Sequence, residues 1–122
     1  MTQEEKQLLL KDLCARLPYG AFVFIRKPFG CVMSETEEEE LTATTLQEFI
    51  ENDDMHVFPY LRPMSSMTFK ETREFLSIKN GECKEYLLTT DKQDWLNEHH
   101  FDYRGLIEKG IALEAPEGMY NS

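Results

Sequence analysis

The sequence predicts an α+β fold, with an N-terminal helix, a small and mostly antiparallel sheet, and two or three further short helices packed on one side of it. Three observations lead to this prediction: leucines at helical spacing near the N-terminus, short runs of β-branched and aromatic residues, and helix-capping motifs between those runs. The chain has 122 residues, 41% of them hydrophobic, which is the size and composition of one folded domain. We therefore expect a single domain over residues 1–115. Residues 116–122 should form a loose tail, although Met119 and Tyr120 are large enough to pack back.

The first helix should begin at Thr2, because Thr2 with Glu5 three residues later has the spacing of a capping box. It should end near Arg16, because Pro18 disfavours helical geometry in the residue before it. Its predicted buried stripe consists of Leu9, Leu10, Leu13, Cys14 and Leu17.

Residues 21–25 form the best strand of the sequence, since they are rich in β-branched and aromatic side chains. Residues 26–30 contain Pro and Gly and predict a turn, after which residues 31–33 would return as the second strand of a hairpin. Residues 55–61 should also be extended. Within them Pro59 has no N–H to donate, which favours an edge strand or an irregular segment.

Capping signals predict two helices in the middle of the chain. One covers residues 45–50, with Thr45 and Glu48 as a capping box. The other begins at Ser65, Ser66 or Thr68 and carries a partial apolar face made of Phe69, Phe75 and Leu76. After it, residues 80–81 predict a turn, residues 86–90 a strand, and residues 111–113 a last short strand.

The block of residues 94–107 is rich in aromatic side chains and holds the single tryptophan. Asp91 should cap the helix that enters it, and Trp95 and His99, four residues apart, should share one face. The helix should give way to a turn in which Gly105 takes a positive φ. Aromatic side chains of this size dominate small cores, so we expect Trp95 to anchor the structure.

Acidic residues outnumber basic ones by 23 to 13, a net charge of -10. Such a charge repels phosphate backbones, so direct nucleic-acid binding is not expected. Residues 35–54 hold nine acidic residues and no Lys or Arg, with an unbroken run at Glu37, Glu38, Glu39 and Glu40. This run is either a solvated loop or charged edge strand, or a surface that docks on a basic protein partner or imitates phosphates.

An alternative site lies at His99, His100, Asp102 and Arg104, whose side chains would suit a small ligand, a metal ion or an enzyme active site. Adjacent helical histidines point about 100° apart, so satisfied histidines at a helix end are the simpler interpretation. Arg62 and Arg104 could each bind an anion, but an ion pair that pins a turn is favoured in so acidic a chain.

Other features exclude function classes. There is no nucleotide-binding glycine motif, no nucleophile elbow and no His-Glu-x-x-His zinc motif. We expect no catalytic residue, no cofactor and no metal. The sequence contains neither a secretory signal nor an apolar run of membrane-spanning length, and its three separated cysteines (Cys14, Cys31 and Cys83) fit reduced thiols, so we expect a cytoplasmic protein that does not enter a membrane.

Residues 13–20, 59–68 and 95–107, together about a quarter of the chain, resemble blocks found in a group of small acidic proteins of unassigned function. These proteins occur in gut bacteria of the Bacteroides group and in their phages and mobile elements. The resemblance implies a cytoplasmic bacterial or phage product and brings no activity, cofactor or catalytic residue. We expect a non-enzymatic accessory or protein-interaction domain, of an oligomeric state that the sequence leaves open.

Overall fold

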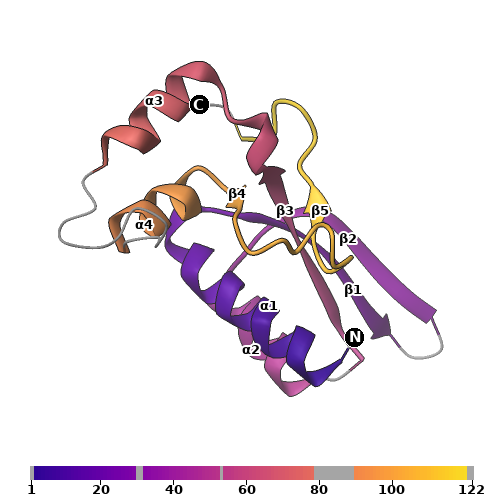
Figure 1. Ribbon diagram of the computed structural model, residues 1–122. Coiled ribbons are helices and arrows are strands. Elements are labelled where there is room, and N and C mark those ends of the chain that lie inside the picture. The colour runs from indigo at the N-terminus through magenta and orange to yellow at the C-terminus, as the bar shows by residue number, and fades with distance from the viewer. Residues whose placement is uncertain (1, 30–31, 53, 79–89, 121–122) are drawn as a thin grey trace.

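The computed structural model describes residues 2–29, 32–52, 54–78 and 90–120, and these form the predicted α+β fold (Figure 1). The strands are β1 (Phe22–Phe29), β2 (Val32–Glu40), β3 (His56–Pro63), β4 (Phe101–Asp102) and β5 (Leu113–Glu114). The helices are α1 (Gln3–Arg16), α2 (Ala43–Glu51), α3 (Phe69–Ser77) and α4 (Thr90–Glu98), with 3-10 turns at Leu17–Tyr19 and Met64–Ser66. None of the helices in these ranges is long and apolar enough to cross a bilayer.

The sheet has the strand order β2-β1-β3-β4, with β5 also beside β3. The long ladders of β1 with β2 and with β3 are antiparallel, whereas β4 and β5 each pair with β3 in parallel over two residue pairs. The antiparallel part matches the expectation. The parallel part arises because the chain passes through helices and loops before it returns to β3, which is the connection that parallel pairing requires.

One face of the sheet packs against α1 and α2, which lie in front of it in Figure 1. Side chains alternate along a strand, so every second residue of β1 and β3 enters this core. The buried cluster draws on Leu9 and Leu13 of α1, Val23 and Ile25 of β1, Leu46 and Phe49 of α2, and Val57 and Leu61 of β3. The loop residue Leu106 joins the same cluster.

Two strand predictions were wrong in detail. β1 continues through residues 26–29, where a turn was expected, because pairing with β2 outweighs the local preference of Pro and Gly. Pro59 lies in β3 inside the sheet, paired with Val23, rather than on an edge. Its missing N–H is tolerated because β5 begins to pair with β3 only at Tyr60, one residue later.

The predicted helix starts are partly confirmed. Both halves of the capping box form at Thr2 with Glu5, and again at Thr68 with Glu71. The serines of residues 65–66 therefore do not cap α3; they lie in the preceding 3-10 turn. Thr42 caps α2 in place of Thr45.

Several burial and boundary predictions also changed. Phe69 and Leu76 are 81% and 69% exposed, so α3 does not pack its apolar face on the sheet. Cys14 is exposed rather than part of the buried stripe of α1. Asp91 lies inside the first turn of α4 and does not precede it. The turn predicted at residues 80–81 lies outside the described residues, as do Cys31, Cys83 and residues 86–89 of the strand predicted over 86–90.

Candidate functional site

β2 is the outermost strand of the described sheet, with β1 on one side and no described strand on the other. Its nine residues include the whole acidic run from Glu37 to Glu40, and all four of these side chains are exposed. Of the two simple structures expected for this run, a loop or a charged edge strand, the edge strand is the one observed. The free edge leaves backbone N–H and C=O groups on its outer side without a strand partner among the described residues.

A β-bulge divides the acidic run between the two faces of the sheet. Val23 pairs with Glu39 but Ile25 pairs with Thr36, so β2 carries two residues opposite Phe24. Glu38, one of the two, has φ 52, in the left-handed region. A bulge of this kind twists a strand and redirects its side chains. Glu39 consequently shares the face of buried Val23, whereas Glu40 shares the opposite face with Phe22.

The carboxylates of Glu37 to Glu40 form no ion pair within the described residues. The nearest basic residues of β1 are engaged elsewhere: Arg26 Nε lies 3.1 Å from Glu35 Oε1, and Lys27 Nζ lies 3.2 Å from Glu48 Oε2. The edge therefore presents a concentration of uncompensated negative charge to solvent.

The residues of the alternative site point to four different places. His99 Nδ1 lies 2.9 Å from the carbonyl oxygen of Trp95, and the two rings stack with their centroids 4.0 Å apart. Trp95 itself is half-buried and also stacks on Phe101, which makes it part of an aromatic cluster rather than a fully buried anchor. The Nδ1 atom and the ring of His99 are thus both engaged in contacts with Trp95.

His100 is buried and takes a positive φ of 64, which turns the chain from α4 into β4. Its ring stacks on Tyr120 with centroids 3.7 Å apart, and no residue in the described part of the chain forms a hydrogen bond with its Nδ1. Burial, reinforced by the charges of Arg16, His99 and Arg62, lowers the pKa of His100 to about 4. The imidazole is therefore neutral at pH 7 and part of the interior.

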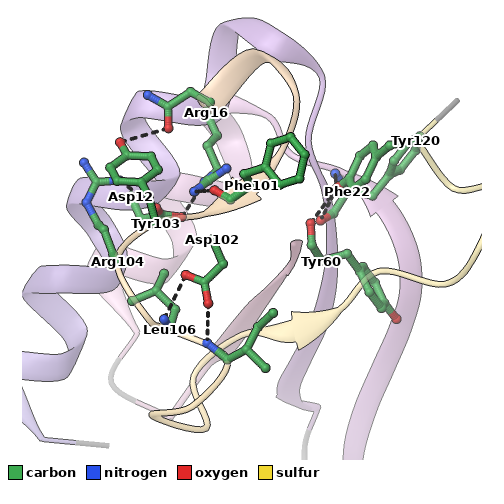
Figure 2. Close-up of polar contacts among 12 residues, drawn as sticks. Asp12, Arg16, Phe22, Tyr60, Phe101, Asp102, Tyr103, Arg104, Leu106 and Tyr120 are labelled. Carbon is green, nitrogen blue, oxygen red and sulfur yellow. Dashed lines mark hydrogen bonds and ion pairs between the residues drawn. The ribbon is translucent and has the colours of Figure 1, made fainter. Parts of the chain in front are cut away.

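Asp102 and Arg104 stabilise the turn that follows β4. Figure 2 shows the Asp102 carboxylate directed into that turn, where it accepts hydrogen bonds from the backbone N–H groups of Leu106 and Ile107 at 2.9 and 3.0 Å. Arg104 Nη1 reaches back to Asp12 Oδ1 at 2.7 Å. Gly105 has φ 73, as the predicted turn requires.

The ion-pair interpretation of the two arginines is confirmed. Besides the Arg104 contact, Arg62 donates two 2.7 Å hydrogen bonds to Glu71, one to each carboxylate oxygen. This pair ties α3 to β3, and its hydrogen bonds are the main reason that the pKa of Glu71 falls to about 2. Both arginines are thus paired with carboxylates of the described structure.

Metal-binding geometry is also missing from this region. Across the described ranges, no group of three or more His, Cys, Asp or Glu side chains is placed to hold a metal ion. A pocket of about 530 Å³ touches Asp102, but it is lined by none of His99, His100 and Arg104. Within the described residues, His99, His100 and Arg104 therefore do not line this pocket together with Asp102.

The sheet face turned away from α1 and α2, called the reverse face here, carries aromatic side chains. Because Val23, Ile25 and Val57 point into the core, their neighbours Phe22, Phe24 and Phe58 point the other way. Phe24 and Phe58 are directly paired across the strands, with ring centroids 6.2 Å apart.

The C-terminal segment, expected to be a loose tail, packs onto this face through Tyr120. The N–H of Phe22 donates to the Tyr120 hydroxyl at 2.8 Å, and that hydroxyl donates to the carbonyl oxygen of Tyr60 at 2.8 Å (Figure 2). Between this anchor and β2 lies a pocket of about 320 Å³, lined by Phe22, Glu38 and residues 116–119.

Comparison with known proteins adds nothing to this geometry, because no family model, no curated protein and no solved structure matches the chain.

Sequence reasoning missed two features that matter here. One is the ion-paired group of Asp12, Arg16 and Arg104; the spacing of residues 9, 12, 13 and 16 places Asp12 and Arg16 on the apolar stripe of α1, and this signal could have revealed them. The other is the pocket beside Glu38. It depends on the register of β2 and on the path of residues 116–119, for which the sequence carries no local signal.

Proposed function

We propose that this protein is a non-enzymatic interaction domain that binds a basic segment of a protein partner along the acidic edge of β2. One observation carries the proposal: a nine-residue edge strand with four successive exposed carboxylates that no described cation neutralises. The outer backbone groups of such a strand can hydrogen-bond to an added strand, which is a common mode of peptide recognition. The carboxylates of Glu37 to Glu40 then determine which polypeptide segments can pair with β2.

Charge favours a basic segment over a second copy of this chain. Like charges directly opposite one another destabilise a strand pair, so two β2 edges would repel. Lysine or arginine residues on an added strand would instead meet Glu37 to Glu40 across the new ladder. The same charge also keeps an unpartnered edge soluble, and this simpler role predicts no saturable binding.

The proposal includes the form in which the acidic edge imitates nucleic-acid phosphates and occupies a nucleic-acid-binding protein. Direct contact with nucleic acid is not part of it, given the net charge of -10. The resemblance to small acidic proteins of Bacteroides-group bacteria, phages and mobile elements supports an accessory role in the bacterial cytoplasm. The lone, widely spaced cysteines support the same compartment.

The test uses a fluorescent peptide of about ten residues that alternates lysine and valine, matched in length to β2. Its anisotropy is followed as the protein is added, at about 0.05 M and about 0.5 M salt. We expect saturable binding that weakens at the higher salt concentration. A peptide with the same lysines but prolines in place of the valines cannot extend a sheet, and we expect it to bind far more weakly.

Two charge-reversal variants separate the edge from overall charge. In the first, Glu37, Glu38, Glu39 and Glu40 are replaced by Lys. In the second, the same change is made at four exposed glutamates away from β2, namely Glu4, Glu74, Glu98 and Glu108. We expect the first variant to lose at least about tenfold in affinity and the second less than about threefold, with little change in stability for either. Equal losses, or equal binding of the proline peptide, would remove the proposal.

A further inference from the structure

We infer that the bound segment inserts one lysine or arginine side chain into the pocket on the reverse face between β2 and the C-terminal segment. The inference rests on the proposed function, because the bound partner is the same basic segment. It adds which type of side chain that segment must carry. The pocket, of about 320 Å³, is lined by Phe22, Glu38 and residues 116–119.

Three separate parts of the chain fix the pocket. Phe22 is the first residue of β1, and its ring lies 5.8 Å from that of Tyr120. The β-bulge gives β2 the extra residue that brings Glu38 to this side. The Tyr120 hydroxyl is bonded to the backbone of β1 and β3, and the hydrogen bond from Met119 N–H to the Pro116 carbonyl closes the preceding turn. The segment that carries Glu117 is thereby held against the sheet.

The lining suits a cation on an apolar stem. The charged side chains of the pocket wall are the carboxylates of Glu38 and Glu117, and the apolar ones include Phe22 and Met119. A lysine or arginine side chain can lay its methylene groups along the apolar wall while its charged end meets the carboxylates. The Phe22 ring adds a favourable surface for the same cation. An acidic side chain would be repelled by Glu38 and Glu117. An apolar side chain would shield these two carboxylates from water without offering them a hydrogen-bond donor or a positive charge.

The charges of the acidic run also affect Tyr60 of β3. Burial, together with the charges of Glu37 and Glu38, raises the pKa of the Tyr60 hydroxyl. Tyr60 belongs to β3, two strands away from β2 in the sheet order. The acidic run therefore acts on the aromatic face as well as on the free edge.

The pocket lies within reach of a strand added to β2. Neighbouring strands are about 4.8 Å apart, and alternate side chains of an added strand would point to the reverse face. A lysine or arginine side chain is long enough to cross the width of β2 beside Glu38. The occupant is therefore a basic residue at one reverse-facing position of the bound segment.

The experiment pairs two double variants with the lysine–valine peptide. Glu38→Gln with Glu117→Gln removes both pocket carboxylates. Glu74→Gln with Glu108→Gln changes the net charge equally and is the control, since both glutamates are exposed and lie outside β2 and outside the pocket lining. We expect the pocket variant to bind about tenfold more weakly and the control less than about threefold.

A second set of peptides identifies the inserted side chain. Each lysine in turn is replaced by norleucine, which keeps the stem and removes the charge. One replacement should cost the unmodified protein about tenfold in affinity and cost the Glu38→Gln, Glu117→Gln variant almost nothing, as a double-mutant cycle requires for groups in contact. Thermal unfolding of both variants, whose changed residues are exposed, shows that the fold is retained.

The outcomes distinguish this inference from the proposed function. If the reversal of Glu37 to Glu40 abolishes binding but the pocket variant binds normally, the inference fails and the proposed function stands. If the lysine–valine peptide does not bind at all, both fail. If the pocket variant alone dissociates a dimer in the absence of peptide, the pocket belongs to a second copy and the inference is overturned.

Discussion

Replacing Asp12 by alanine should destabilise the protein more than any change on the acidic edge. Asp12 is fully buried, and its two carboxylate oxygens accept hydrogen bonds from Arg16 Nε at 2.8 Å and Arg104 Nη1 at 2.7 Å. Arg16 is fully buried as well, and one of its terminal nitrogens, Nη1, already has no hydrogen-bond partner among the described residues. Without Asp12, the Arg16 guanidinium would keep a single hydrogen bond among the described residues, to the carbonyl oxygen of Phe101 at 2.6 Å.

The expected cost follows from the burial of both partners. Removal of one member of a buried ion pair typically costs about 3–5 kcal/mol, because an uncompensated charge stays in the interior. A domain of this size has a total stability of about 5–15 kcal/mol, so this loss is a large fraction of the whole. The side chain of Arg104 is 14% exposed and can be hydrated, so Arg104→Ala should cost only about 1–2 kcal/mol.

Urea unfolding followed by the fluorescence of Trp95, the single tryptophan, measures these losses directly. The double variant Asp12→Ala, Arg16→Met provides the decisive comparison. The double variant removes the Arg16 charge that Asp12→Ala alone leaves unpaired. Its loss in the free energy of unfolding should therefore be smaller than the sum of the losses of Asp12→Ala and Arg16→Met. A cost below about 1 kcal/mol for Asp12→Ala, or full additivity in the double variant, would refute the reasoning.

Three further predictions concern single side chains. The folded-state pKa of Glu71 is about 2 against an ordinary 4.5, so its stabilising effect is complete above pH 4.5 and is lost as the pH falls toward 2; Glu71→Gln should flatten the urea-stability profile in that window. The pKa of His100 is about 4 in the folded protein against an ordinary 6.5, so the stabilising contribution of the neutral buried imidazole is complete above pH 6.5 and is lost as the pH falls toward 4. The variant His100→Asn, in which Asn tolerates the positive φ, should therefore lose less stability between pH 6.5 and pH 4 than the unmodified protein. Tyr120→Phe leaves the N–H of Phe22 without its acceptor and should lower the free energy of unfolding by about 1–3 kcal/mol, whereas Tyr19→Phe, at a half-buried position, should change it by less than about 0.5 kcal/mol in the same urea titration.

Local signals predicted the parts of the fold that local chemistry determines. The capping boxes at Thr2 and Thr68 form because both partners lie within one helical turn, so spacing alone specifies them. Gly105 takes the positive φ that its turn requires for a similarly local reason. The strand expected over residues 21–25 is present because its side chains suit a covered sheet face.

Contacts between distant parts of the chain account for what the sequence did not reveal. Arg104 meets Asp12 across 92 positions, and Tyr120 meets Phe22 across 98. The strand β1 continues through Pro28 because of its ladder with β2, a tertiary effect that outweighs the local turn signal. Of the candidate site, the exposure and charge of residues 37–40 were foreseeable. The bulge that turns Glu38 toward Phe22 was not, because a shift of register is set by the whole ladder.

The separation of buried from exposed charge leads to a final prediction about salt. Arg16, Arg62 and Arg104 are committed to internal carboxylates, and such partly or fully buried pairs are screened only weakly by ions. The carboxylates of Glu37 to Glu40 are exposed, so screening acts fully on their attraction for a basic partner. Raising the salt concentration from about 0.05 M to about 0.5 M should therefore weaken peptide binding while leaving the urea midpoint unchanged or slightly raised, because self-repulsion of the acidic surface falls at the same time. If the midpoint instead dropped in parallel with the affinity, exposed ion pairs would have to stabilise the fold, and the expected difference between the buried ion pairs and the exposed carboxylates of β2 would be wrong.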